Sequence, residues 1–219
     1  MTIISFKHNF IFVKTTKTAG TSIEVDLSQL AGEDAIVTPI RPPVPGHEAR
    51  NHLAPDGTPA FFNHMPATLI RARLGAARFR QMFKFCVERE PVSKCISHFH
   101  MLCNSPLHRP AEGAPSWAAY CAAGSFPKDT ARYSEMQDGR RVLLVDRVLR
   151  YDTLQDDLAA VMQHLGIRGF ALRSTAKSEY SRTVRVRPED VTAAERARIA
   201  AAFAETQALT GIDWTRPAG

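Results

Sequence analysis

Residues 10–22 read FIFVKTTKTAGTS, an apolar run followed by two lysines, several hydroxyl-bearing residues and one glycine. The apolar run predicts a short strand over residues 9–14. Apolar residues then recur every three to four positions, which predicts a helix over residues 21–31. A strand, a tight turn and a helix N-terminus together favour an anion, because backbone N–H groups and the helix dipole both attract negative charge.

The order of Lys17 and Gly20 does not fit the nucleotide-binding loop of ATPases and GTPases. That loop has the pattern G-x-x-x-x-G-K-[ST], with glycine before lysine, and the chain contains no match to it. Here Lys17 comes first and supplies a mobile cation, while Gly20 lets the backbone approach an anion closely. The hydroxyls of Thr18, Thr21 and Ser22 can donate to its oxygens. Alternatively, these residues are only a lysine and an ordinary helix start, without a bound anion.

Beyond this stretch the chain alternates strands with helices. Strands are predicted within residues 82–87 and 141–151, and helices at residues 66–73, from Pro91, at 116–123, at 153–165 and at 192–209. In the helix over residues 66–73, Leu69 and Ile70 are expected to face the core. At the start of the last helix, Thr192 and Glu195 are expected to form a capping box. The alternation predicts an α/β fold whose mostly parallel sheet is covered by helices, with a ligand at the carboxyl ends of the strands.

Length and composition limit the possible classes of protein. The 219 residues, 44% of them hydrophobic, suit one globular domain. The formal charge of +6 indicates an anionic partner or, alternatively, a basic surface that aids solubility. The four cysteines lack C-x-x-C spacing, so we expect reduced thiols and no metal site. No signal-peptide pattern or long apolar run is present, so we expect no membrane span and a cytoplasmic location.

A second group of polar residues follows the strand predicted at residues 82–87. Arg89 comes directly after this strand, and Ser97 lies eight residues later in the next helix. Arginine offers forked, charge-assisted hydrogen bonds and serine a further donor, so both can bind one anion near the helix start. Alternatively, Arg89 pairs with Glu88 or Glu90 as part of an ordinary turn.

The stretches KTAGTS and VEREPVSKCISHF, in this order and about seventy residues apart, resemble the sulfotransferases that use PAPS (3′-phosphoadenylyl sulfate). The resemblance is to the branch of carbohydrate and heparan sulfate 2-O-sulfotransferases and their bacterial relatives, and VDRVLRYDTLQDDLAAVMQHLGI at 145–167 also resembles a late strand and helix of that family. It implies a single sulfotransferase domain over residues 1–219, with a P-loop-like three-layer fold. It further implies in-line transfer of a sulfuryl group to a hydroxyl, expected on a carbohydrate or glycoconjugate, without a metal.

The resemblance assigns roles to individual residues. The loop that binds the 5′-phosphosulfate is implied for Lys17, Thr18, Ala19, Gly20, Thr21 and Ser22. Arg89 and Ser97 would bind the 3′-phosphate. In the basic stretch after residue 166, Lys177 and Ser178 are expected to close over the nucleotide, unless that stretch is simply a solvated basic loop.

The acceptor hydroxyl needs a base, and His64 in FFNHMP (61–66) corresponds to the family's catalytic histidine. An imidazole whose pKa lies near 7 suits deprotonation of a hydroxyl as its bond to sulfur forms. Lys17 is the second catalytic residue, because it would stabilise charge on the leaving oxygen. The alternative is a structural role for His64, and His47 and His52 are weaker candidates for the base.

The chain departs from the family pattern at three positions. The family often has proline where Thr16 stands, asparagine or aspartate where Glu90 stands, and a second arginine where Lys94 stands. Glu90 places negative charge beside a proposed phosphate site, so these departures concern the affinity for the cofactor.

Two other classes of function are consistent with the sequence. A P-loop kinase or NTPase is disfavoured by the order of lysine and glycine and by the lack of an acidic strand end for a metal. A non-catalytic module that binds anions or nucleic acid agrees with the charge of +6, but no stripe of alternating basic and aromatic residues supports it. We therefore expect a hydroxylated acceptor, such as a glycan, and no nucleic acid as partner.

Overall fold

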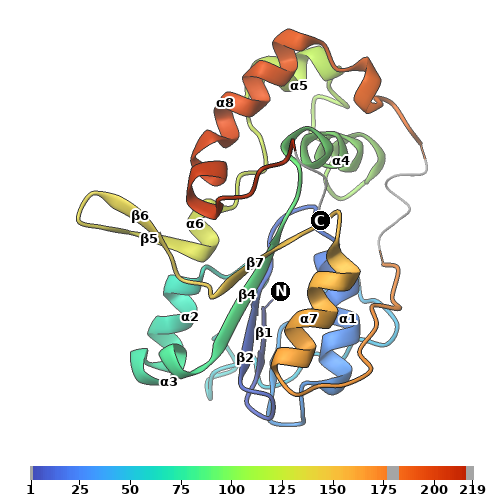
Figure 1. Ribbon diagram of the computed structural model, residues 1–219. Coiled ribbons are helices and arrows are strands. Elements are labelled where there is room, and N and C mark those ends of the chain that lie inside the picture. The colour runs from blue at the N-terminus through green and yellow to red at the C-terminus, as the bar shows by residue number, and fades with distance from the viewer. Residues whose placement is uncertain (1, 177–182, 216–219) are drawn as a thin grey trace. The chain divides into compact units, whose positions relative to one another are not determined.

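The computed structural model of the chain describes residues 2–176 and 183–215 (Figure 1). The chain divides into two compact units. The sheet unit comprises Met1–Glu88 and Asp129–Ala176, and the helical unit comprises Arg89–Lys128 and Lys177–Gly219. One sulfotransferase domain over residues 1–219 stays a prediction.

A five-stranded mixed sheet forms the centre of the sheet unit, in the order β3-β1-β2-β4-β7. Its strands are β1 (Thr2–Ser5), β2 (Phe10–Val13), β3 (Ile36–Val37), β4 (Phe83–Glu88) and β7 (Arg147–Arg150). The core strands β2, β4 and β7 run parallel, as predicted, whereas β1 pairs antiparallel with both of its neighbours. Only residues 6–9 join β1 to β2, which is too short for the crossover that parallel strands require.

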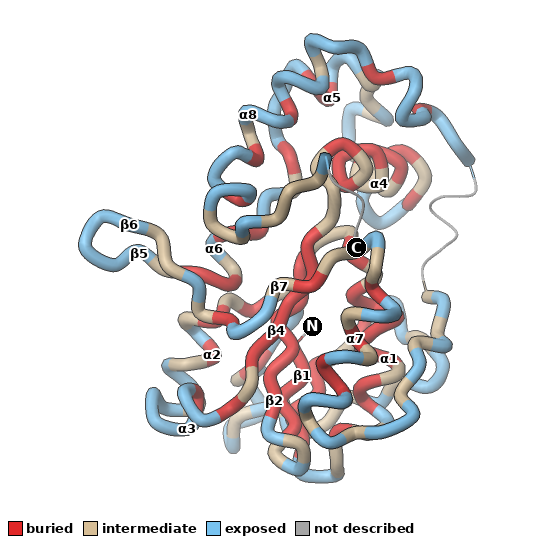
Figure 2. The backbone as a smooth tube through the Cα atoms, viewed as in Figure 1, coloured by how far each residue is buried: buried red, intermediate tan, exposed pale blue. Residues whose placement is uncertain are grey.

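Helices cover both faces of this sheet because its central strands are apolar on both sides. Helices α1 (Gly20–Leu30) and α7 (Leu154–His164) lie on one face, and α2 (Ala67–Leu74) and α3 (Ala76–Gln81) lie on the other (Figure 1). Phe12 belongs to the core cluster shared with α1 and α7, and Ile11, on the opposite face of the strand, is also fully buried. Figure 2 shows this burial as continuous red along β1, β2 and β4.

Two predictions for the sheet unit need correction. In α2, Ile70 is buried as expected, but Leu69 is 46% exposed. Neighbouring residues of a helix point about 100° apart, so Leu69 lies to the side of the face that Ile70 turns to the core. The single strand predicted within residues 141–151 is in fact two strands, β6 (Arg140–Leu143) and β7. The apolar run does not reveal that its two halves pair with different partners.

The first half of that run belongs to a hairpin outside the main sheet. Among the described residues, strand β6 pairs with β5 (Ser134–Gln137) alone. The hairpin that these two strands form follows the short helix α6 (Thr130–Tyr133) and extends away from the sheet (Figure 1). An ion pair between Arg71 on α2 and Glu135 on β5 connects the hairpin to the helices. Residues 38–60 are irregular, as their prolines predict.

The helical unit contains α4 (Pro91–Asn104), α5 (Trp117–Ala123), the 3₁₀ turn η2 (Pro188–Asp190) and α8 (Ala193–Thr210). Its core includes Val92, Ile96, Phe99 and Cys103 from one face of α4, together with Tyr120 and Phe203. The predicted capping box of α8 is present: the Thr192 N–H donates to Glu195 Oε2 at 2.9 Å, and the Glu195 N–H donates to Thr192 Oγ1 at 3.3 Å.

All four cysteines are free thiols and are buried, in agreement with the expectation of reduced cysteines. Burial raises the pKa of the Cys95 thiol to about 12, so this thiol is unreactive at neutral pH. Within residues 2–176 and 183–215, no helix combines the length and the hydropathy that crossing a membrane requires.

Candidate functional site

The loop between β2 and α1 has the backbone geometry of an anion site. Lys17 and Ala19 both adopt left-handed backbone angles, with φ of 61° and 56°. Such angles are uncommon for residues with a side chain, and their alternation with ordinary angles aims successive N–H groups into one concavity. Ala19 is also the N-cap of α1 and offers no side-chain oxygen to the first turn of the helix. The N–H groups of that turn are therefore suited to an outside acceptor.

The hydroxyl of Thr18 is directed into the protein. It lies 2.8 Å from the hydroxyl of Thr15, which in turn donates to the carbonyl of Val87 at the end of β4. These bonds fasten the loop to the neighbouring strand. The Thr18 side chain thus stabilises the loop, because its hydroxyl bonds within the protein.

Lys14 and Glu24 form a buried ion pair beneath the same loop. The Lys14 Nζ lies 2.8 Å from Glu24 Oε2 and 3.2 Å from Thr21 Oγ1. A Cβ on Gly20 would lie 2.7 Å from Lys14 Cε, so the glycine leaves room for this lysine. Because an ammonium only donates, Thr21 Oγ1 accepts from Lys14, and the hydroxyl keeps its own proton for donation to another group.

The chain returns to the N-terminal turn of α1 after α7. The carboxylate of Asp26 accepts hydrogen bonds from the N–H groups of Arg173 at 2.7 Å and Ser174 at 3.0 Å. The Ala176 N–H donates to Ser22 Oγ at 3.0 Å. Lys177 and Ser178 lie outside the described residues, directly after this anchored segment in the chain.

His64 lies in the turn before α2, beside Lys14 at the start of the loop between β2 and α1, and has an unusual backbone, with φ of 58°. Its Nδ1 is 3.3 Å from the carbonyl oxygen of Lys14. A carbonyl can only accept, so Nδ1 carries the proton and Nε2 holds the lone pair. The imidazole is therefore in the tautomer that a general base with a free Nε2 requires.

The pKa of His64 is lowered from 6.5 to about 3. Burial is the largest cause, and the positive charges of Lys14 and Arg132 add to it, whereas the negative charge of Asp129 opposes them. The imidazole is therefore neutral at physiological pH, but it is a weaker base than the expected value near 7 implies. A polyanion bound beside it would raise this pKa.

A hydrogen-bond network joins His64 to the loop through residues distant in sequence. Asp129, which is 1% exposed, accepts from the Thr16 N–H at 2.8 Å and from its hydroxyl at 3.0 Å. Arg132 Nε donates to Asp129 at 2.6 Å, and its Nη1 donates to the His64 carbonyl at 2.6 Å. Neither Asp129 nor Arg132 is expected from the sequence, because they lie in the weakly patterned region 105–140, where no motif marks them.

In the helical unit, Arg89 lies against the first turn of α4. Its Nε donates to Ser93 Oγ at 2.9 Å. Ser93 and Ser97 are four residues apart, so they occupy the same face of the helix. Ser93 therefore lies between Arg89, from which it accepts a hydrogen bond, and Ser97, one turn further along the helix. In the sequence, only its spacing of four residues from each of them could have indicated it.

The carboxylate of Glu90 caps α4. It accepts hydrogen bonds from the Val92 N–H at 2.9 Å and from the Ser93 N–H at 2.6 Å. Aspartate and asparagine, which the family often has here, are common N-caps for the same reason. The departure at this position therefore keeps the capping function, with the negative charge directed at the helix N-terminus.

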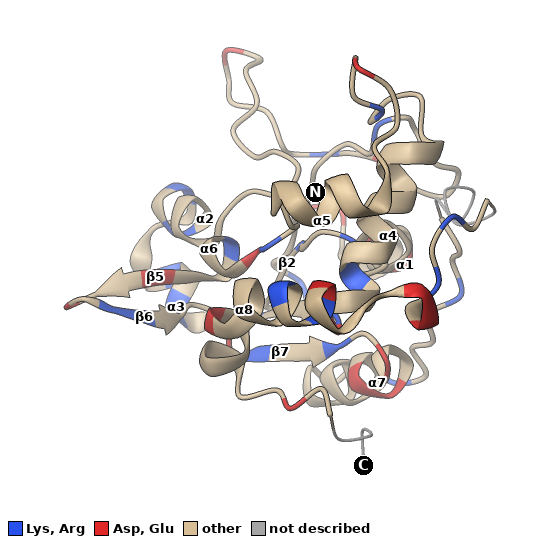
Figure 3. Cartoon of the chain, turned by 90° about the horizontal axis from the view of Figure 1, so that it is seen from above, with Lys and Arg blue, Asp and Glu red and all other residues tan. Residues whose placement is uncertain are grey.

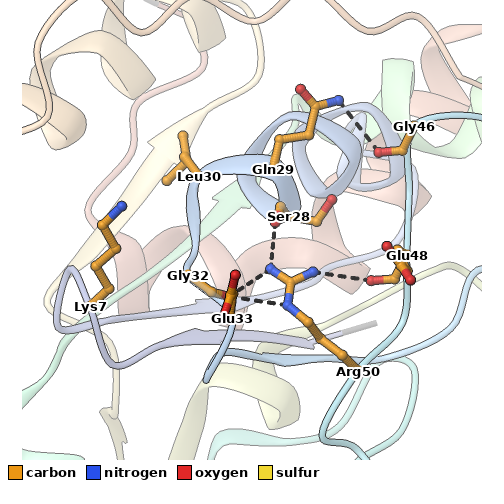
Figure 4. A pocket seen from close by; sticks show the side chains of 9 residues that line it. All are labelled: Lys7, Ser28, Gln29, Leu30, Gly32, Glu33, Gly46, Glu48 and Arg50. Atoms are coloured by element: carbon orange, nitrogen blue, oxygen red, sulfur yellow. Dashed lines mark hydrogen bonds between the residues drawn. The ribbon is translucent and has the colours of Figure 1, made fainter.

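A hollow of about 520 Å³ opens at the other end of α1 (Figure 4). It is lined by Lys7, Ser28, Gln29, Leu30, Gly32, Glu33, Gly46, Glu48 and Arg50. The guanidinium of Arg50 donates to the carbonyls of Ser28 at 2.7 Å and Gly32 at 2.8 Å, which completes the last turn of the helix. This hollow is separate from the loop at Gly20, where the helix begins.

His47 lies in the proline-rich loop, and its Nε2 is buried without a hydrogen-bond partner among the residues that the structure describes. Burial lowers its pKa, although the negative charge of Glu24 opposes this effect. The positive charges of Lys14 and Arg50 lower this pKa further.

Compared with known proteins, the chain matches no protein-family model and no curated protein.

Proposed function

We propose that the protein is a sulfotransferase that transfers the sulfuryl group of PAPS to a hydroxyl, on a carbohydrate or glycoconjugate. The observation that carries this proposal is the loop at residues 14–20, whose left-handed Lys17 and Ala19 lead into an N-terminal helix turn that lacks a side-chain cap. We propose in addition that the mixed sheet and its covering helices form a P-loop-like three-layer fold.

The loop suits the phosphosulfate end of PAPS. Its N–H groups and the dipole of α1 favour a negatively charged group at Gly20. Thr21 has its proton directed away from Lys14, and Ser22 accepts from Ala176, so each hydroxyl still has a proton to donate. Lys17 adds a mobile positive charge at the bond that breaks.

The 3′-phosphate of PAPS is assigned to Arg89, which precedes α4, and to the face of α4 that carries Ser93 and Ser97. Arg89 offers charge-assisted donors, and the two serines supply hydroxyls one turn apart. A kinase or NTPase has no use for such a group, because ATP and GTP lack a 3′-phosphate.

The chemical step is an in-line displacement at sulfur. His64 Nε2 takes the proton of the acceptor hydroxyl as the new oxygen–sulfur bond forms. The bond between sulfur and the bridging oxygen of the 5′-phosphate breaks, and PAP (3′,5′-adenosine diphosphate) leaves with the electron pair. Lys17 and the loop N–H groups stabilise the charge that builds on the bridging oxygen.

Binding to nucleic acid is the weaker alternative. On α8, the longest described helix, acidic Glu195 and Glu205 are interspersed with Arg196 and Arg198 (Figure 3). Such a surface lacks the uniform basic stripe that favours a phosphate backbone.

Transfer of radiolabelled sulfate from PAPS to a panel of glycans, glycolipids and small hydroxylated metabolites tests the proposed activity. We expect labelled product from at least one carbohydrate, with one PAP released for each sulfate transferred. Labelled product with none of the acceptors, and no slow release of sulfate to water, would contradict the proposal.

A further inference from the structure

We propose that Asp129 and Arg132 are positioning residues that hold the loop between β2 and α1 and the general base His64 in one fixed arrangement. This inference rests on the proposed function. Neither residue belongs to the two motifs that carry the resemblance. They connect three segments of the sheet unit: the loop at Thr16, the turn at His64 and the segment at residues 129–132.

Asp129 fixes the loop at its start. The carboxylate is buried and takes both donors of Thr16, the backbone N–H and the hydroxyl, from 113 residues away in the sequence. Thr16 directly precedes Lys17, the first left-handed residue of the loop. A backbone bond at this position therefore sets the direction in which the loop leaves β2.

Arg132 fixes the base. Its Nη1 donates to the carbonyl of His64, whose backbone adopts a left-handed angle that a residue with a side chain rarely takes. Its Nε donates to the same Asp129 oxygen that accepts from the Thr16 hydroxyl. The bond from Thr16 and the bond from Arg132 thus end on one carboxylate, so movement of the loop and movement of the histidine are coupled.

The arrangement uses Thr16, a position at which the chain departs from the pattern that it resembles. Thr16 stands where the resembled family often has proline, and proline has no N–H to donate. The Thr16 N–H donates one of the hydrogen bonds that Asp129 accepts from the loop, and Asp129 also accepts from Arg132. The departure from the family pattern is therefore what allows the carboxylate to hold the loop backbone.

The network also sets the charge around His64. The N-terminal amino group, Lys14 and Arg132 are positive groups that disfavour its protonation, and Asp129 is the negative group that favours it. Removal of the Asp129 charge thus leaves a histidine that accepts a proton less readily, in addition to a loop that is held less firmly.

The first test measures His64 directly by ¹⁵N NMR of the imidazole and needs no substrate. We expect the Nδ1–H tautomer in the wild-type protein, and a mixture of tautomers in Arg132→Gln and in Asp129→Asn. Arg132→Lys, which keeps one donor, should retain part of the wild-type signal. Arg73→Gln, at an exposed arginine on α2, is the matched control and should change nothing.

The second test separates positioning from binding. In Arg132→Gln we expect kcat to fall by about 10²-fold, the loss that a small misplacement of a reacting group causes, while the Kd for PAP changes by less than about threefold. If Asp129→Asn fails to fold, Thr16→Val removes the hydroxyl bond alone and should lower kcat in the same direction by about tenfold.

The two proposals fail in different ways. If the wild-type protein does not bind PAP, the proposed function is wrong, and the NMR spectra still decide whether Asp129 and Arg132 hold His64. If PAP binds, but the variants keep the wild-type tautomer and the wild-type kcat, the positioning role is wrong and the sulfotransferase proposal stands.

Discussion

Lys14 lies across Gly20, so that a Cβ added to the glycine would be 2.7 Å from Lys14 Cε and 2.8 Å from Lys14 Cγ. The glycine of the KTAGTS stretch thus has a role inside the protein as well as at the proposed anion site. It allows the lysine to reach the buried carboxylate of Glu24, and this ion pair supports the first turn of α1.

Gly20→Ala should destabilise the protein by about 1–3 kcal/mol, because Lys14 must leave its place or strain the helix. Helix propensity alone predicts the opposite, since alanine is better than glycine by about 1 kcal/mol within a helix. Urea unfolding of the variant measures the difference. In a Lys14→Ala background the same change should be neutral or stabilising, and an equal loss in both backgrounds would show that the contact with Lys14 is not the cause.

Glu24→Gln should cost about 3–5 kcal/mol of stability, because it leaves the Lys14 ammonium buried beside a neutral group. The side chains are 9% and 0% exposed, so solvent screens this pair little. A Lys14→Met/Glu24→Gln double variant should lose less than the sum of the single changes. The half-exposed pair of Arg150 and Asp152 is the control, for which disruption should cost less than about 1 kcal/mol.

Local patterns of sequence account for much of the fold. The apolar run before Lys14 predicts β2, the spacing of apolar residues predicts α1, α4 and α7, and Thr192 with Glu195 predicts the start of α8. Each of these depends on neighbours within a few positions. The division of residues 141–151 into β6 and β7 depends on which strands lie beside them, and no local pattern contains that information.

In the candidate site, too, local motifs are predictable from the sequence, and contacts between distant residues are not. The residues of KTAGTS and Arg89 are recognisable because they form short motifs, whereas Asp129 meets Thr16 across 113 residues. The pKa of His64 could not be read from the sequence either, because it depends on burial and on charges from two other segments. Leu69 shows the same limit in the core, since its helix is correct but its face is wrong.

His64 should make stability depend on pH in a defined window. Its pKa is about 3 in the folded protein and 6.5 in its ordinary state, so the unfolded chain binds a proton between these values that the folded protein does not. Unfolding free energy should therefore fall as the pH drops below 6.5, by about 2 kcal/mol at pH 5, with no contribution above this range.

The check is urea unfolding of wild-type protein and His64→Gln at pH 7.5 and pH 5. The variant should lose less stability on acidification than the wild type does. An identical pH dependence in the two proteins would mean that His64 is not held neutral by its surroundings.

Ser93 should contribute to the affinity for PAP, although the resemblance assigns the 3′-phosphate only to Arg89 and Ser97. We expect Arg89→Ala to raise the Kd by about 10–10²-fold and Ser93→Ala and Ser97→Ala by up to about tenfold, the range for hydrogen bonds to a charged group. Ser125→Ala, at an exposed serine of the same unit, should leave the Kd unchanged. A Ser93 variant with wild-type affinity for PAP would remove this residue from the 3′-phosphate site.

Lys17 should separate catalysis from binding. Lys17→Ala should lower the rate of sulfate transfer by about 10²–10³-fold, the typical effect of losing one group that stabilises developing charge. The Kd for PAP should change only modestly, because the loop N–H groups remain. Single-turnover transfer from PAPS measures the first quantity and calorimetry the second, and equal losses in both would assign Lys17 to binding alone.

The most direct test of the central claim is a calorimetric titration of the protein with PAP and, separately, with ATP and Mg²⁺. PAP carries a 3′-phosphate and one 5′-phosphate, whereas ATP carries a 5′-triphosphate and no 3′-phosphate. The 3′-phosphate is the group that the proposed sulfotransferase site recognises. We predict binding of PAP that Arg89→Ala weakens, and no binding of ATP with Mg²⁺ under the same conditions. Binding of ATP with Mg²⁺ and none of PAP would contradict the assignment.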